Sequence, residues 1–304
     1  MRIVRFVLSP LLVALFLTAC SDDEGDGDDG VLQVLASNSI VADWIANVGG
    51  EGVEVESIIP AGADVHSFQL SPSSVRAIGD ADILFLIGAS LEASFEDVVE
   101  ENANGPVVQL AEGLSLRKFE GHAHEGEIEE EDEHDDGDFD PHIWMDADLA
   151  IAAVERIANE LAELDPGAAD TFRANAAGYA GEIRQMDATI AATLSGLSAE
   201  RKLLVTFHDA YGYFADRYGL TVLGFVVENA DEEPSAAAIA ALVTDMREAD
   251  ASKIYIEPQF SARVVEQVAA EANAEVRTIP SDALADEYPT YIALMEAIAH
   301  GIAS

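Results

Sequence analysis

From residue 31 onward, short apolar runs alternate with amphipathic stretches. Short apolar runs between turn residues are typical of buried strands, whereas apolar residues repeated every three or four positions are typical of helices. In the first half, the pattern predicts strands at Val31–Ala36, Val53–Ile59, Ile83–Ile87 and Val107–Leu110, with helices at Ser39–Val48, Ser71–Asp80 and Phe95–Asn102.

The same alternation returns after residue 200. Strands joined by helices pair in parallel, with the helices covering the faces of the sheet. We therefore expect an α/β fold with two lobes, each a mainly parallel sheet covered by helices. The second lobe has predicted strands at Leu203–Phe207, Val222–Val227, Ile254–Ile256 and Val276–Ile279, and helices at Ala210–Tyr218, Ser235–Ala249, Ala262–Ala272 and Tyr288–Ala303.

Two helical patterns separate the alternating regions. Ala147–Leu164 is predicted to be a helix that ends at Asp165-Pro166-Gly167, and Ala168–Leu194 continues without interruption. At 1.5 Å per residue, the second helix would be about 40 Å long, enough to cross a two-lobed molecule. The predicted organisation is an N-terminal lobe at 31–165, a linking helix at 166–196 and a C-terminal lobe at 197–304.

The N-terminus has the features of a secretory signal. Arg2 and Arg5 precede an apolar run from Phe6 to Leu17, which is too short for a transmembrane helix. The sequence Leu17-Thr18-Ala19-Cys20 resembles a bacterial lipobox. We expect a signal peptide at 1–19, a lipidated Cys20 that anchors the protein outside the cytoplasm, and an acidic tether at 20–30. The alternative is an ordinary signal peptide in which Cys20 has no role.

Composition narrows the choice of partners. The 58 acidic residues outnumber the 15 basic residues and give a formal net charge of −43, which disfavours nucleic acid and anionic lipid as partners. This charge does not itself indicate a metal site, because acid-rich, lysine-poor surfaces also suit saline surroundings. Cys20 is the single cysteine, so an intramolecular disulfide and a thiolate metal site are both excluded. Any bound metal must have nitrogen and oxygen ligands.

Three of the seven histidines occupy similar positions in the pattern. His66 follows a predicted strand, His142 follows an acidic segment, and His208 follows the strand LLVTF; Asp282 follows the last strand. In open parallel sheets, ligands bind beyond the carboxyl ends of the strands, so these four donors can share one cleft. Three imidazoles and one carboxylate suit Zn²⁺ better than Ca²⁺ or Mg²⁺. Each histidine alone is also compatible with a structural role.

Several stretches together resemble the zinc/manganese solute-binding lipoproteins of ABC transporters. The resemblance covers essentially the whole mature chain and is carried by these stretches, in this order: PAGADVHSFQLSPSS, DPHIWMDADLA, VTFHDAYGYFADRYGL, EEPSAAAIAAL and IYIEPQFSARVVEQVA. The resemblance implies two α/β lobes joined by a long helix, a metal between them, and ligands at His66, His142, His208 and Asp282. It also implies a monomer that delivers metal to a membrane permease.

The sequence differs from the family motifs at two places, and one further position bears on the choice of metal. The usual Asp-Pro-His is Asp64-Val65-His66 here, and the sequence around Asp282 matches only loosely. In this family, manganese-type members tend to carry a carboxylate at the position of His208. The resemblance therefore favours zinc, with manganese or iron as the alternative.

Two further features could assist metal binding. Glu257 is a charged residue at the end of an apolar strand, where it would either orient a histidine or form a structural salt bridge. The segment 120–140 consists mostly of acidic residues, glycine and histidine, and we expect it to be a mobile loop. Its histidines, His122, His124 and His134, would capture metal weakly or have no role in an ordinary solvated loop.

Other function classes fit less well. A zinc hydrolase needs an open coordination position for water, which a fourth ligand would close. The chain also has neither His-Glu-x-x-His nor Gly-x-Ser-x-Gly. We therefore predict that the protein is not an enzyme. A metal-binding adhesin or buffer without a transporter remains an alternative at this level.

Overall fold

The computed structural model describes residues 31–118, 139–228, 230 and 232–304. Its first half contains a four-stranded parallel sheet with the order β2-β1-β3-β4. The chain adds β2 on one side of β1 and then returns to add β3 and β4 on the other side. Each helix α1 to α3 connects successive strands. The elements are β1 (Leu32–Ala36), α1 (Ser39–Gly49), β2 (Val53–Ser57), α2 (Pro72–Asp80), β3 (Ile83–Leu86), α3 (Glu96–Asn102) and β4 (Val107–Gln109).

The second half is built in the same way from two parallel strand pairs. The inner strands β5 and β7 contact each other. The elements are β5 (Leu203–Thr206), α6 (Gly212–Tyr218), β6 (Thr221–Phe225), α7 (Ala236–Glu248), β7 (Lys253–Ile256), α8 (Arg263–Ala272) and β8 (Glu275–Thr278). The parallel sheets and the helices between their strands confirm the predicted α/β fold class.

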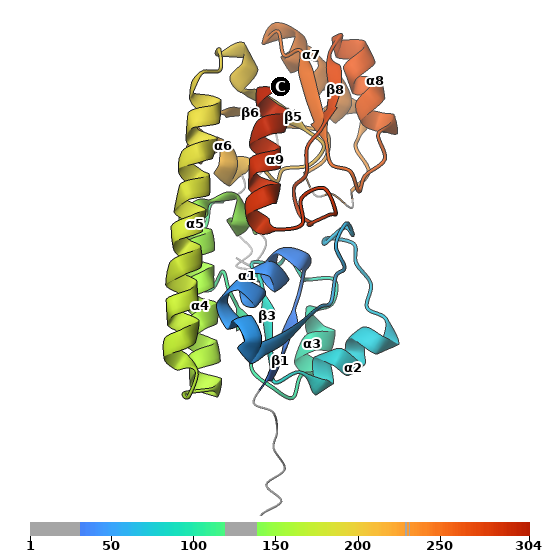
Figure 1. The fold of residues 1–304 in the computed structure, drawn as a ribbon. Coiled ribbons are helices and arrows are strands. Elements are labelled where there is room, and N and C mark those ends of the chain that lie inside the picture. The colour runs from blue at the N-terminus through green and yellow to red at the C-terminus, as the bar shows by residue number, and fades with distance from the viewer. Residues whose placement is uncertain (1–30, 119–138, 229, 231) are drawn as a thin grey trace, which may run out of the picture. The chain divides into compact units, whose positions relative to one another are not determined.

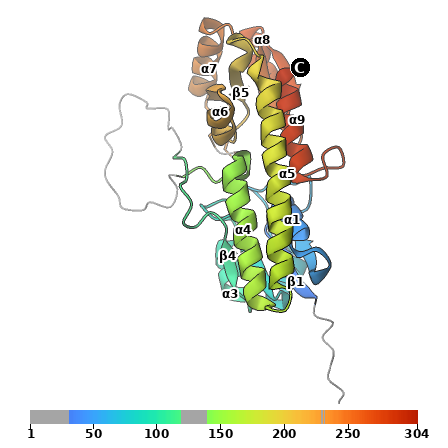
Figure 2. The ribbon, with the colours of Figure 1, turned by 60° about the vertical axis from the view of Figure 1, so that its left-hand side comes forward.

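Three helices connect the two halves. α4 (Ala147–Leu164) packs along α5 (Ala169–Ser195), which continues past it to contact α6 and α9 (Tyr291–Ala303) in the second half. The 27 residues of α5 correspond to a length of about 40 Å. Figures 1 and 2 show α5 running beside both sheet-containing halves. This one helix therefore supports both halves.

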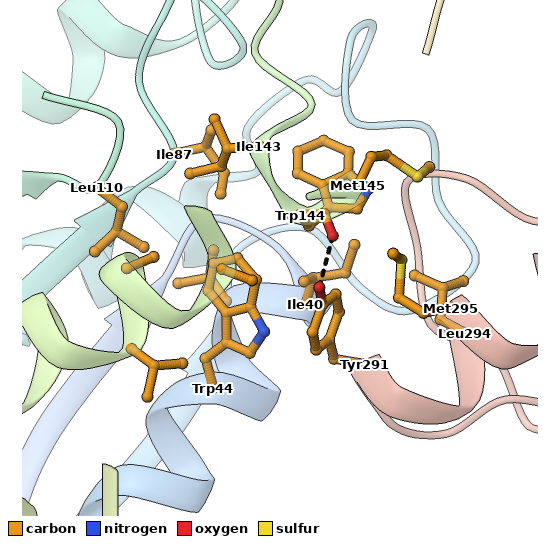
Figure 3. Packing of buried hydrophobic residues seen from close by; sticks show 14 of the residues in the cluster. Ile40, Trp44, Ile87, Leu110, Ile143, Trp144, Met145, Tyr291, Leu294 and Met295 are labelled. Carbon is orange, nitrogen blue, oxygen red and sulfur yellow. Dashed lines mark hydrogen bonds between the residues drawn. The ribbon is translucent and has the colours of Figure 1, made fainter. Parts of the chain in front are cut away.

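A group of large buried side chains fixes the segment after His142. Trp44 of α1 packs edge-on against Tyr291 of α9, with their ring centroids 5.3 Å apart. The Tyr291 hydroxyl donates a hydrogen bond of 2.7 Å to the backbone oxygen of Trp144 (Figure 3). Trp144 belongs to the short 3₁₀ helix η2 (Ile143–Met145), whose three side chains are all buried. The core thus holds η2 between α1 and α9.

Several predicted boundaries were wrong by one to three residues. The last helix begins at Tyr291 because the Thr290 hydroxyl accepts a hydrogen bond from the backbone N–H of Ala293 and caps it. The strand predicted at Val53–Ile59 ends at Ser57, and the helix predicted from Ala210 begins at Gly212. Within the described ranges, no helix is both long and apolar enough to cross a membrane.

Candidate metal centre

The structure brings His66, His142, His208 and Asp282 into one cluster. His66 lies in the loop between β2 and α2, and His142 directly precedes η2. His208 lies two residues beyond β5, and Asp282 lies four residues beyond β8. Each residue can offer one ligand atom such that all four atoms lie within 4.8 Å of one another. Both halves of the molecule therefore contribute to the cluster.

The three imidazole rings surround the carboxylate evenly. Each pair of ring centroids is 5.4 Å apart. The Nε2 atom of His208 lies 3.3 Å from Oδ2 of Asp282, and the Nε2 atoms of His66 and His142 each lie 3.9 Å from one of its oxygens. The four donors thus face a common point from different directions, which is the arrangement that coordination requires.

The converging atoms are buried and have no hydrogen-bond partner outside the cluster. This holds for Nε2 of all three histidines and for both carboxylate oxygens of Asp282. His66 is the most exposed of the four, with 13% of its side chain accessible, whereas Asp282 is fully buried. Burying polar atoms without partners is costly, and native proteins rarely do so. A cation among these atoms would satisfy all of them at once.

Two further carboxylates fix the orientation of two of the three imidazole rings. Oδ1 of Asp140 lies 2.7 Å from Nδ1 of His142, and Oε1 of Glu257 lies 2.8 Å from Nδ1 of His208. Asp140 and Glu257 are both almost completely buried. A carboxylate at Nδ1 holds the proton there and leaves Nε2 free to act as a ligand. Glu257 thus contacts His208, and this contact is compatible with both of its predicted roles.

Sequence reasoning missed Asp140, although a local signal was present. Oδ1 of Asp140 accepts a hydrogen bond from the backbone N–H of His142, which folds the Asp-x-His segment into a turn. Asp64 makes the same contact with the backbone N–H of His66. An aspartate two residues before a candidate ligand therefore indicates a histidine held in a turn.

The charges of the cluster are strongly coupled. Burial lowers the pKa of His208, but the neighbouring Glu257 and Asp282 carboxylates more than offset this effect and raise it well above its usual range. Burial also lowers the pKa of His66, to about 3, and so keeps its ring neutral. For Asp282, the histidines outweigh the effect of burial and lower its pKa below the ordinary range. Burial raises the pKa of Glu257.

Hydrogen bonds from both halves hold the loop that carries Asp282. The indole N–H of Trp144 donates to the backbone oxygen of Ser281 at 2.9 Å, and the Tyr211 hydroxyl donates to that of Pro280 at 2.9 Å. The backbone N–H of Leu284 donates to the Ser39 hydroxyl at 3.0 Å. Trp144 also lies edge-on against the His142 ring, with centroids 5.2 Å apart. The same residue thus positions two members of the cluster.

Four other residues singled out in the sequence lie outside the described residues. They are Cys20, His122, His124 and His134.

Fold and site together define a metal-binding protein with two α/β halves and a buried centre of three histidines and one carboxylate. The family model for zinc-uptake complex component A, periplasmic, matches residues 34–304. The chain belongs to this family, as its motifs predict.

Named relatives and solved structures agree with this assignment. The manganese-binding lipoprotein MntA of Halalkalibacterium halodurans is 27% identical over 97% of this chain and 96% of its own length. A zinc-bound ZnuA deletion mutant has a TM-score of 0.77 at 27% identity, covering 90% of this chain and 97% of the other. A manganese-bound mutant of a periplasmic metal-binding protein from Candidatus Liberibacter asiaticus also has a TM-score of 0.77, at 26% identity, covering 90% and 98%.

Family membership confirms the predicted class of function. The family consists of substrate-binding proteins of metal ABC importers, which work outside the cytoplasm with a membrane permease. The chain is therefore a metal-binding transport protein and not an enzyme. Its relatives are named for both zinc and manganese, so the family does not specify which of the two it carries.

Proposed function

We propose that this protein captures Zn²⁺ through His66, His142, His208 and Asp282 and delivers it to the permease of an ABC importer. The observation that carries the proposal is the set of buried ligand atoms without partners, three imidazole nitrogens and one carboxylate. Three nitrogens and one oxygen suit the borderline softness and tetrahedral preference of zinc.

Zinc requires a modest contraction of the cluster. Zn–N and Zn–O distances near 2.0–2.1 Å place tetrahedral ligand atoms about 3.3 Å apart. His208 Nε2 and Asp282 Oδ2 already have this separation of 3.3 Å, whereas His66 and His142 are 3.9 Å from the carboxylate. Small ring movements would complete the shell. Asp282 and His208 would therefore form its fixed part.

Manganese is the second candidate, and one observation favours it. Both oxygens of Asp282 lack hydrogen-bond partners outside the cluster, so the carboxylate could bind through two atoms and raise the coordination number. Manganese prefers oxygen ligands and larger coordination numbers than four. Three imidazoles nevertheless leave the shell richer in nitrogen than manganese prefers.

His208→Glu tests the choice of metal. An added carboxylate should shift preference towards manganese, so the zinc-over-manganese affinity ratio should fall by at least about tenfold, or roughly 1.4 kcal/mol. Both affinities are measured by competition against one chelator, together with elemental analysis of protein purified without added metal. His300→Glu, at an exposed position of α9, is the matched control. An unchanged ratio would show that His208 does not contact the metal.

The remaining parts of the proposal concern the rest of the chain. We propose that residues 1–19 are removed as a signal peptide, that lipidated Cys20 anchors the protein, and that residues 20–30 form a tether. The protein would act as a monomer with lobes at 31–165 and 197–304 and a linking helix at 166–196. His122, His124 and His134 would capture metal weakly near the centre.

A further inference from the structure

Arg117 connects the surroundings of His142 to the second half of the molecule. Its Nη1 atom lies 3.7 Å from Oδ2 of Asp140, and its Nε atom donates to Oδ2 of Asp216 on α6 at 3.2 Å. The other oxygen of Asp140, Oδ1, contacts Nδ1 of His142. Asp140 is fully buried, whereas Asp216 is largely exposed. One carboxylate thus joins the Arg117 guanidinium to the His142 imidazole.

Gly212 provides the space in which the guanidinium lies. A Cβ atom at this position would come within 2.5 to 2.9 Å of three guanidinium atoms of Arg117. These contacts are closer than real Cβ atoms approach their neighbours. Gly212 is not among the glycines with positive φ, so its backbone conformation does not explain the choice of glycine. Glycine at this position is instead explained by the space that the Arg117 guanidinium occupies.

Tyr213, the next residue of α6, fixes the backbone of both partners. Its hydroxyl oxygen accepts a hydrogen bond of 2.8 Å from the backbone N–H of Arg117 and donates one of 2.9 Å to the backbone oxygen of Asp140. The backbone N–H of Asp140 in turn donates to the backbone oxygen of Arg117 at 2.9 Å. The two residues are therefore held in register by a helix that begins shortly after His208.

We propose that Arg117 is a positioning residue for metal binding: seated against Gly212, it holds the Asp140 carboxylate, which in turn holds the His142 ring with Nε2 towards the metal. The proposal deepens the proposed function, because it rests on His142 as a ligand. Without the guanidinium, Asp140 would be a buried carboxylate near the buried Asp209 carboxyl group. Such a buried, uncompensated carboxylate is unfavourable, and an Asp140 side chain that turns away from this position holds His142 less firmly.

Two substitutions perturb this arrangement by different means. Arg117→Met removes the charge, and Gly212→Ala displaces the guanidinium without removing any charge. Each should weaken zinc binding by about 10-fold to 100-fold, the usual effect of losing a group that orients a ligand. Arg117→Lys should restore part of the affinity. The double variant should bind no more weakly than Arg117→Met alone, because there is then no guanidinium to displace.

Two control substitutions test whether the effect is specific. Asp216→Asn removes one exposed partner of Arg117 and should leave zinc affinity unchanged. Gly178→Ala adds a methyl group to α5 where no atom beyond the adjoining backbone of the helix lies within 4 Å of the new Cβ, and it should also have no effect on affinity. Thermal unfolding of each variant without metal reports general damage. The visible spectrum of bound Co²⁺ reports coordination geometry and should change for Arg117→Met and Gly212→Ala only.

The outcomes separate the two proposals. Affinities are measured with both zinc and manganese, so the role of His142 is tested whichever metal the wild type prefers. Wild-type protein that binds neither metal tightly would overturn the proposed function. Tight wild-type binding with unchanged affinity in Arg117→Met and Gly212→Ala would overturn the positioning role alone, as would additive losses in the double variant. If Arg117→Met does not fold, Gly212→Ala provides the same test.

Discussion

Replacing Glu257 by glutamine would remove one negative charge beside His208 while keeping the shape of the side chain. In the structure, the His208 ring lies between two carboxylates: Oε1 of Glu257 is 2.8 Å from Nδ1, and Oδ2 of Asp282 is 3.3 Å from Nε2. Burial lowers the pKa of His208, but these carboxylates raise it well above its usual range. At neutral pH and without metal, the ring is therefore protonated on both nitrogens and carries a positive charge.

A metal ion must displace that proton, because only a neutral imidazole can act as a ligand. Binding should release about one proton at neutral pH, and affinity should rise about tenfold per pH unit until the pH reaches the raised pKa of His208. Below the ordinary pKa of histidine, the His208 ring is fully protonated. It loses the proton as the pH rises through the raised pKa that His208 has in the folded protein. Competition from the proton therefore weakens as pH rises.

Glu257→Gln should change both the proton count and the affinity. With one carboxylate removed, the pKa of His208 falls, and fewer protons are released on binding. Losing the carboxylate that orients the ring should also weaken zinc binding by about 10-fold to 100-fold, or roughly 1.4 to 2.7 kcal/mol. Protons compete less with zinc in the variant, because the pKa of His208 is lower there. The loss of zinc affinity should therefore be smallest at low pH and should reach its full size at high pH.

Calorimetric titration in buffers of different ionisation enthalpy counts the protons released, and chelator competition at several pH values gives the affinities. Glu266→Gln, at an exposed position of α8, is the matched control. If Glu257→Gln released as many protons as the wild type and bound zinc equally tightly, the coupling between Glu257, His208 and the metal would be wrong.

The remaining predictions concern parts of the chain outside the metal centre. Cys20→Ser should release soluble protein or leave uncleaved precursor, because acyl chains on Cys20 would supply the membrane attachment; a normally processed variant that still fractionates with the membrane as the wild type does would contradict the lipid anchor. Deleting Gly121–Asp138 should lower the number of weakly bound zinc ions in equilibrium dialysis while the tight site keeps its affinity. Loss of tight binding on deletion would instead make this loop part of the site.

The order of strands and helices could be predicted because buried parallel strands are continuous apolar runs and their connecting helices are amphipathic. The ends of the elements were less predictable, because they depend on individual caps. Thr290, for example, begins the last helix at Tyr291, three residues later than the apolar pattern indicates. The long helix α5 was predictable since no proline interrupts Ala169–Ser195.

The four converging side chains were found from their places beyond strands and from the family resemblance, but the groups that hold them were found only in part. Glu257 was noticeable as a charge at the end of an apolar run. Arg117 and Trp144 were not noticeable, because their roles depend on contacts with α6 and with the loop at Ser281, far away in sequence. Gly212 is also informative only once the guanidinium that lies against it is known.

The charges buried around the site explain why a divalent cation suits it. Arg117 and Asp140 form an ion pair, while the Glu257 and Asp282 carboxylates are the two negative charges that contact the His208 ring, in an almost completely buried cluster. Buried charges are stable only when they are compensated, and an ion with two positive charges balances them fully. A monovalent ion would leave one charge uncompensated, whereas the proton on His208 offsets only half of the deficit. The formal charge of −43 on the whole chain adds little to this balance, because salt screens exposed charges over about 8 to 10 Å. Charge therefore selects a divalent ion, and the three imidazoles select a transition metal among the divalent ions.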